Sequence, residues 1–345
     1  RNRYSYRTYP ARYVGWISKL CYASYSFAYY KPSKLMEHKK LRRGNIFLNS
    51  NMRYTAILLS AFILFLLQNS PVSAQTEGFL PFNSGKIYYK VQGEGTPILF
   101  VHAGFQDHNM WNPQVAHFSK KHKVIVFDVP GHGATVSDTA RPQAAAVIKA
   151  VMDGLHIEKA VVVGLSLGGA MAIDFAVQHP QRVQKLVLAG SGLSGWDENR
   201  KVDTTTTQYV TALFDALGKK DTALAATIFV KNWFAGPTRT KEQLAPNLWD
   251  SGYAVTYQNM RKHKISGWPR FAQPAAIHSL KTLPMPVLIL TGTIDMPEVL
   301  LMNAWLKEHI PNARQVLLPG QAHMLNLEDP VQFNKLIEDF IKQPS

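Results

Sequence analysis

The sequence predicts an α/β fold in which a mostly parallel sheet is flanked by helices. After Gln75, short runs rich in Val, Ile and Leu alternate with longer amphipathic stretches, as in chains that build a parallel sheet covered by helices. The apolar runs lack polar alternation, which is typical of strands buried on both faces. Of the 345 residues, 46% are hydrophobic, which is enough for a full core.

The predicted strands and helices follow one another in a broadly βαβα order. Predicted strands occupy residues 86–91, 97–102, 124–129, 160–164, 185–189, 287–291 and 315–318. Predicted helices include residues 144–155, 168–179, 297–309 and 330–342. Each of these helices follows a strand after a loop, as the connection between parallel strands requires.

Between Ser191 and Leu283 the alternation gives way to helical patterns dense in aromatic residues, which predicts an inserted helical cap over about residues 192–283. Aromatic side chains at this density are first of all core. A cap over a cleft also faces inward, so some of them are expected to line a hydrophobic acyl or alkyl pocket. The aromatic residues of this region are Trp196, Phe214, Phe229, Trp233, Phe234, Trp249, Tyr253, Tyr257 and Trp268.

The formal net charge of +15 is concentrated at the start of the chain. Residues 1–74 carry about twelve lysines and arginines against one acid, Glu37, which leaves the remainder only about four units positive. No stretch after Gln75 interleaves basic and aromatic residues as a nucleic-acid surface does, so nucleic acid is not an expected partner. The single cysteine, Cys21, lies in the basic segment, so the folded part can form neither a disulfide nor a thiolate metal site.

Residues 52–74 have the three parts of a secretory signal peptide. Arg53 precedes the apolar run 56–67, and small residues stand at Val72 and Ala74, where signal peptidase reads the chain. Cleavage after Ala74 predicts a secreted or periplasmic protein. The alternative is a membrane anchor, but a run of about a dozen residues is shorter than the roughly 20 needed to span a bilayer. No stable membrane anchor is therefore expected after cleavage.

Residues 1–51 begin with Arg and show neither strand alternation nor a helical apolar stripe. We interpret them as upstream sequence read in frame, with Met52 or Met36 as the true start. A disordered arm is the alternative. In either case the folded domain is expected to cover residues 75–345.

A candidate nucleophile lies in the run from Gly164 to Gly168, where G-x-S-x-G follows a buried strand and precedes an amphipathic helix. This context is that of a nucleophile elbow, in which the serine occupies a strained turn between strand and helix. The flanking glycines allow close approach of the chain where a Cβ would clash. Ser166 is therefore the predicted nucleophile, with an ordinary turn serine as the alternative.

A serine hydroxyl needs a base and an acid that orients the base, and candidates for both follow in the chain. Asp295 comes after the strand 287–291 and just before a helix start marked by Pro297, a helix that it would otherwise cap. His323 lies in a glycine-containing loop after the last predicted strand. The order Ser, Asp, His fits nucleophile-elbow hydrolases, so Ser166, Asp295 and His323 are the predicted catalytic triad.

These residues together resemble the α/β-hydrolase superfamily, and the likeness covers about residues 85–341. Two further motifs agree with it. The segment His102-Ala-Gly-Phe105, with Trp111 after it, resembles the family's His-Gly oxyanion segment, and the segment 128–133 resembles its Asp-x-x-Gly-x-Gly loop. The resemblance implies the α/β-hydrolase fold with an inserted helical cap.

The resemblance also implies two oxyanion donors, the backbone N–H groups of Gly104 and Leu167. Ala103 stands where the family usually has glycine, so the first donor is either Gly104 or the next residue, Phe105. Three polar residues of the two motifs have family counterparts that are usually structural: His102, Asp128 and His132.

The type of nucleophile decides among the subfamilies. Epoxide hydrolases and haloalkane dehalogenases need an aspartate where Ser166 stands, and proline iminopeptidases usually carry His-Gly-Gly-Pro-Gly where this chain has His-Ala-Gly-Phe-Gln from His102. Esterases, lactonases, C–C bond hydrolases and cofactor-free perhydrolases or acyltransferases are left, all serine-based and without a metal or cofactor.

The likeness is greatest to enol-lactonases and small carboxylesterases. It implies cleavage of a small-molecule carboxylic ester or lactone through an acyl-enzyme on Ser166. A non-catalytic ligand-binding protein with the same fold is an alternative from another class. The sequence specifies no oligomeric state.

Overall fold

The computed structural model describes residues 75–137, 141–198, 200–263 and 265–344. The expectations for residues 1–51, for the signal peptide 52–74 and for Cys21 lie outside these residues. In the described ranges, none of the helices combines the length and the apolar character that crossing a bilayer needs.

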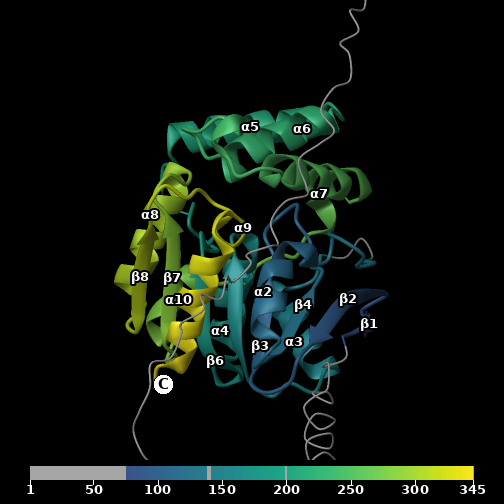
Figure 1. Ribbon diagram of the computed structural model, residues 1–345, viewed down its shortest axis with the longest axis vertical. Coiled ribbons are helices and arrows are strands. Elements are labelled where there is room, and N and C mark those ends of the chain that lie inside the picture. The colour runs from purple at the N-terminus through teal and green to yellow at the C-terminus, as the bar shows by residue number, and fades with distance from the viewer. Residues whose placement is uncertain (1–74, 138–140, 199, 264, 345) are drawn as a thin grey trace, which may run out of the picture. The chain divides into compact units, whose positions relative to one another are not determined.

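An eight-stranded sheet forms the centre of the described chain (Figure 1). Its strands are β1 (Thr76–Phe82), β2 (Gly85–Gln92), β3 (Pro97–Val101), β4 (Lys123–Phe127), β5 (Ala160–Leu165), β6 (Val183–Ala189), β7 (Val287–Gly292) and β8 (Ala313–Leu318). Their order is β1-β2-β4-β3-β5-β6-β7-β8. Only the pairs β1–β2 and β2–β4 are antiparallel. The mostly parallel sheet predicted from the sequence is confirmed.

The central strands are the most apolar ones. All residues of β5 and β7 are buried, and Val and Ile side chains suit a pleated surface that is covered on both faces. The edge strand β1 was not predicted, because its residues are mostly exposed or half-buried and include a glycine and a proline. Asn83, at a φ of 51°, helps to turn the chain back from β1 into β2, a position where asparagine is tolerated.

Helices cover both faces of the sheet. They are α2 (Asn112–Phe118), α3 (Ala144–Gly154), α4 (Leu167–Gln178), α8 (Pro297–His309), α9 (Leu325–Glu328) and α10 (Pro330–Lys342). Buried side chains of α3, α4 and α8 share one core with one face of the sheet, and those of α2 and α10 share a second core with the other face. The predicted bounds of α8 and α10 match the structure.

The helix α10 illustrates how the sequence sets an element. Asp329 accepts a hydrogen bond from the backbone N–H of Gln332 at 2.9 Å, and Pro330 occupies the first turn, where a missing N–H costs nothing. Phe333, Ile337 and Phe340 recur at helical spacing and are buried. Capping and one apolar stripe therefore fix both the start of α10 and the face that it turns to the sheet.

The segment between β6 and β7 forms the helical insertion that the sequence predicts. It contains α5 (Thr204–Gly218), α6 (Thr222–Phe229), a π-helical turn (Val230–Phe234) and α7 (Leu248–Lys262), and Figure 1 shows α5, α6 and α7 together beyond one end of the sheet. Residues of this insertion contact the loops that follow β3 and β4. Thr256 Oγ1 accepts a hydrogen bond from Gln106 Nε2 at 2.9 Å, and Asn259 Oδ1 accepts one from the N–H of Gly133 at 2.7 Å. The insertion, called the cap below, therefore lies over the carboxyl ends of the parallel strands.

Candidate active site

Ser166 joins the end of β5 to the start of α4 in a strained conformation. Its φ of 56° and ψ of −115° lie where residues with a Cβ are rarely found. Its N–H donates to the carbonyl of Ala189 at 3.0 Å, and its carbonyl accepts from the N–H of Gly192 at 3.0 Å. The first bond goes to the last residue of β6 and the second to the loop after it, so the strained turn is held by the neighbouring strand.

The glycines on either side of the serine are required by close packing. A Cβ on Gly164 would lie 2.3 Å from the carbonyl oxygen of Gly168, and one on Gly168 would lie 2.1 Å from that of Val101. Such distances are far below van der Waals contact, so the turn forms only with glycine at both positions. The same packing brings the start of α4 against the end of β3.

Asp295 and His323 form a buried pair at the carboxyl ends of β7 and β8. His323 Nδ1 lies 2.8 Å from Asp295 Oδ2, and the two side chains are 1% and 0% exposed. An ionised carboxylate accepts hydrogen bonds only, so the Nδ1–H tautomer is the one that this contact stabilises. His323 Nε2 is buried and has no hydrogen-bond partner within the described residues. Asp295 Oδ1 accepts from the N–H of Met296 at 2.6 Å, and no side chain caps α8.

Gly190 connects the serine turn to this pair. It follows Ala189, which accepts the hydrogen bond from Ser166, and its own N–H donates to Leu290 on β7 at 2.9 Å. A Cβ on Gly190 would lie 2.9 Å from His323 Nδ1 and 3.2 Å from an Asp295 oxygen. Ser166, Asp295 and His323 thus follow β5, β7 and β8, with only β6 between β5 and β7, although no hydrogen bond joins Ser166 to His323 in the described chain. Such bonds are often long without substrate.

The loop after β3 is held by His102. Its Nδ1–H donates to the carbonyl of Ala103 at 2.8 Å, and its Nε2 accepts from the N–H of Val129 at 2.9 Å. Burial lowers the pKa of His102, so the ring is neutral at neutral pH, as this pairing requires. Both nitrogens of His102 are occupied, which agrees with a structural role.

The amides of Gly104 and Phe105 are both available on this loop. The neighbouring Ala103 uses its N–H on Met110 Sδ at 3.3 Å, whereas within the described residues no acceptor pairs with the N–H of Gly104 or Phe105. Phe105 has a φ of 58°, the second strained non-glycine residue of the site besides Ser166. Leu167 begins α4, and its N–H therefore has no acceptor inside that helix.

Asp128 and His132 both form hydrogen bonds within the adjoining loop, where His132 Nδ1 lies 3.3 Å from the carbonyl oxygen of Pro130. Asp128 accepts from the backbone N–H and from Nδ1 of His108, each at 2.8 Å, and from the N–H of Ala134 at 2.7 Å. Burial opposes the ionisation of Asp128, but the bonds from His108 hold the net pKa below its ordinary value. Asp107, His108 and Asp128 offer atoms within 4.8 Å of one another that resemble metal ligands. The Asp128 oxygens already accept these hydrogen bonds, so the cluster fits a structural network better than a metal site.

Four aromatic side chains gather beside the loop after β3. Phe105 packs edge-on against Trp268 and Phe229, with ring centroids 4.8 and 5.3 Å apart. Phe229 also stacks on Trp233, with ring centroids 5.0 Å apart. A Cβ on Gly104 would lie 2.8 Å from the Trp268 ring, so the indole covers the loop directly. Phe105 and Phe229 are buried, while Trp233 and Trp268 are half-buried. We call these four residues the aromatic cluster.

The other cap aromatics have different surroundings. Phe214 is 47% exposed, Phe234 is fully buried, and Trp196 is buried with its Nε1–H donating to Glu298. The sequence predicted that some of the nine would line a pocket, and it had no signal for which ones.

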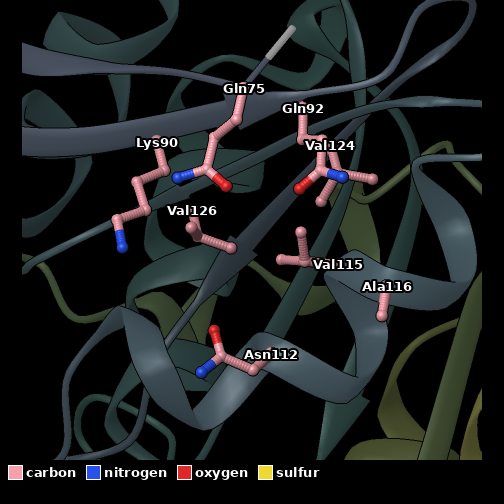
Figure 2. Close-up of a pocket in the computed structure, with 8 residues that line it drawn as sticks. All are labelled: Gln75, Lys90, Gln92, Asn112, Val115, Ala116, Val124 and Val126. Carbon is pink, nitrogen blue, oxygen red and sulfur yellow. The ribbon is translucent and has the colours of Figure 1, made fainter. Parts of the chain in front are cut away.

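A hollow of about 240 Å³ lies away from these residues, between α2, β2 and β4 (Figure 2). Its lining is Gln75, Lys90, Gln92, Asn112, Val115, Ala116, Val124 and Val126. None of the predicted catalytic residues lines it, so it is separate from the candidate active site.

Comparison with known proteins supports the fold and the family of this chain. A family model described as the α/β hydrolase fold matches residues 96–330. The 3-oxoadipate enol-lactonase 1 of Acinetobacter baylyi is 24% identical over 251 residues, which cover 71% of this chain and 88% of the lactonase. A pimeloyl acyl-carrier-protein methyl ester esterase of Nitrosomonas europaea is 28% identical over 263 residues, which cover 72% of this chain and 96% of the esterase.

A solved structure supports the same fold. The esterase RhEst1 from Rhodococcus sp. ECU1013 superposes with a TM-score of 0.65 at 23% identity, over 79% of this chain and 99% of the esterase. The match of the family model over most of the chain, the sheet order and the elbow between β5 and α4 lead to one conclusion: this chain belongs to the α/β-hydrolase fold family.

Proposed function

We propose that the protein is a serine hydrolase that cleaves a carboxylic ester or lactone, with Ser166 as nucleophile, His323 as general base and Asp295 as the acid that orients the base. The observation that carries the proposal is the buried His323–Asp295 hydrogen bond of 2.8 Å, which leaves His323 Nε2 without a partner among the described residues. A neutral imidazole nitrogen with a free lone pair, oriented by a buried carboxylate, is what a serine hydroxyl needs in order to react.

The proposed reaction has two halves. Ser166 Oγ attacks the carbonyl carbon while its proton passes to His323 Nε2, and Asp295 stabilises the imidazolium. The tetrahedral intermediate collapses, the C–O bond to the alcohol breaks, and the alcohol oxygen takes the proton from Nε2. Water then attacks the acyl-enzyme, giving one proton to Nε2. That proton returns to Ser166 Oγ as the acid leaves.

The negative oxygen of each tetrahedral intermediate needs backbone donors. Leu167 is one proposed donor. For the other, Gly104 and Phe105 both have an N–H with no acceptor in the described chain. Loss of one such donor typically costs about 3 to 4 kcal/mol in the transition state. A hydrolase of this design needs no metal and no cofactor.

The aromatic cluster favours a substrate with an uncharged apolar acyl group. Aromatic walls bind apolar groups by burial of surface and leave a carboxylate without a partner. Three basic side chains of the cap are engaged elsewhere: Arg239 pairs with Glu328, Lys262 donates to Gly133 O, and Lys231 donates to Gly236 O.

The test uses the full chain with Ser166→Ala, and with Ser251→Ala as the matched control. Among the described residues, the Ser251 hydroxyl donates only to the carbonyls of Asn247 and Leu248 at the start of α7. A fluorophosphonate probe should label the wild type and the control but not Ser166→Ala. Hydrolysis of p-nitrophenyl butyrate should fall by about a millionfold in kcat in that variant. Esters with butyryl or phenylacetyl groups should be cleaved faster than a p-nitrophenyl hemiadipate.

A folded wild type that is neither labelled nor active would refute the hydrolase and favour a ligand-binding protein of the same fold. Label on a residue other than Ser166 would refute the choice of nucleophile. Transfer of the acyl group to added methanol in preference to water would identify an acyltransferase.

We further propose that residues 52–74 direct export and are removed, which rests on their composition alone. Mass spectrometry of the protein from cell envelope or medium would test this. A chain that retains residues 52–74 would refute it.

A further inference from the structure

The loop that carries His323 is held by hydrogen bonds of the two residues before His323. The N–H of Ala322 donates to Glu328 Oε1 at 2.7 Å. The N–H of Ile294, which precedes Asp295, donates to the carbonyl of Gln321 at 3.1 Å. The two loops of the His323–Asp295 pair are therefore tied to each other and to Glu328 at the end of α9.

The other oxygen of Glu328 binds the cap. Arg239 Nη2 lies 2.7 Å from Glu328 Oε2. The same guanidinium donates to three carbonyls, those of Ala235 at 2.7 Å, Phe234 at 3.0 Å and Gly320 at 3.2 Å. Two of these carbonyls belong to the cap and one to the loop before His323. Arg239 therefore joins the cap to that loop directly, through the carbonyl of Gly320, and indirectly, through Glu328.

The backbone of the cap also reaches both loops at this point. A Cβ on Gly236 would lie 2.6 Å from the carbonyl oxygen of Ile294 and 3.1 Å from Ala322 Cβ. Gly236 has a φ of 77°, which glycine adopts readily. The cap turn thus touches the residue before Asp295 and the residue before His323.

The ion pair is well shielded from water. The side chains of Arg239 and Glu328 are 17% and 7% exposed. Burial raises the pKa of Glu328 above its ordinary value, and Arg239 opposes this rise. A shielded pair with a forked guanidinium fixes geometry more firmly than an exposed one, because Arg holds several acceptors in one plane.

We propose that Arg239 and Glu328 are positioning residues. They form a clamp by which the cap holds the loop of His323 at hydrogen-bonding distance from Asp295. The inference rests on the proposed function, in which His323 is the base. In that role a displacement of the ring by about 1 Å would cost on the order of a hundredfold in rate.

The test compares Arg239→Met, Arg239→Lys and Glu328→Gln in the full chain. Glu328→Gln keeps an acceptor for the N–H of Ala322 and removes the charge. Asp250→Asn is the matched control, because it breaks another cap ion pair, Lys241 Nζ to Asp250 Oδ1 at 2.6 Å, between exposed side chains. Each variant is measured for kcat and KM on p-nitrophenyl butyrate, for thermal unfolding, and by NMR for the hydrogen-bonded Nδ1 proton of His323.

The clamp predicts a fall in kcat of about tenfold to a hundredfold for Arg239→Met and Glu328→Gln, with KM changed by less than about threefold. The Nδ1 proton signal should shift or broaden in both variants at temperatures where they are folded. Arg239→Lys should recover part of kcat, and the double variant should be no worse than the poorer single variant, because the two residues act as a unit. Asp250→Asn should behave as the wild type.

Values of kcat within about twofold of the wild type in folded Arg239→Met and Glu328→Gln, with an unchanged Nδ1 signal, would overturn the clamp. If Glu328→Gln does not fold, the two Arg239 variants decide. A wild type without esterase activity would refute the proposed function separately. The Nδ1 signal then decides the clamp alone: a shift in the variants supports it and no shift overturns it.

Discussion

A methyl group added at Gly190 is expected to disable the His323–Asp295 pair. The Cβ of an alanine there would lie 2.9 Å from His323 Nδ1, 3.1 Å from His323 Cε1 and 3.2 Å from Asp295 Oδ2. Non-bonded atoms involving carbon prefer about 3.5 to 4.0 Å, so the imidazole must move by roughly half an ångström or more. That movement acts on the 2.8 Å hydrogen bond which orients the proposed base.

The substitution Gly190→Ala is expected to lower both the stability and the activity of the protein. Gly190 has a φ of 46°, a left-handed conformation that costs an alanine about 1 to 2 kcal/mol. For a domain of this size that strain corresponds to a fall in Tm of about 2 to 8 °C. Displacement of the base should lower kcat/KM by at least about tenfold, since a misplacement of 1 Å can cost on the order of a hundredfold.

The assay measures kcat/KM on p-nitrophenyl butyrate and Tm for Gly190→Ala and Gly218→Ala. The control fits because a Cβ on Gly218 would meet no heavy atom within 4 Å. Gly218→Ala should keep the activity of the wild type. Full activity in a folded Gly190→Ala protein would refute the reasoning, because it would mean that the geometry of His323 does not control the reaction.

Three further substitutions test other parts of the structure. Lys185→Met removes the ammonium that donates to the carbonyl of Phe340 at 2.9 Å, so the free energy of unfolding in urea should fall by about 1 to 3 kcal/mol, and an unchanged value would contradict this. Burial raises the pKa of Asp174 above 3.8 in the folded protein. The protonated carboxyl therefore contributes stability at low pH, and this contribution is lost as pH rises through the folded-state pKa. The stability of the wild type relative to Asp174→Asn should therefore decline as pH rises from about 4, and a rising difference in denaturant titrations would contradict it. Trp268→Ala opens space beside Gly104, so the ratio of kcat/KM for hexanoyl over acetyl esters should rise. An unchanged ratio would mean that the indole does not contact the acyl group of the substrate.

Elements with a strong local signal were predicted closely. The run of valines in β5 and the proline starts of α8 and α10 set their own bounds, whatever lies around them. The helix α2 was missed, because seven residues with a proline and a histidine show no apolar stripe of their own. It forms as an amphipathic turn only when Phe118 is buried against the sheet, which is a tertiary effect.

The candidate site likewise contains residues that the sequence predicts and contacts that only the fold creates. Ser166, Asp295 and His323 follow from chain order, because the ends of parallel strands meet at one edge of the sheet. The structure brings Asp295 and His323 into contact. The pairing of Arg239 with Glu328 has no sequence signal, since the two residues are far apart in the chain and a charged residue in a cap is usually solvated. Which aromatics join the cluster also depends on the fold of the cap.

The cap contacts both halves of the proposed catalytic machinery. Trp268 covers Gly104, a proposed oxyanion donor on the loop after β3, and Arg239 binds Glu328 beside the loop of His323. A cap that only enclosed the substrate would change KM when it was altered, because it would bind the ground state and the transition state alike. A cap that also fixes donors and base must change kcat, because those groups act most strongly on the transition state. Substitutions in the cap of this protein are therefore expected to divide by position: those at Trp233 act mainly on KM and acyl preference, and those at Arg239 act mainly on kcat.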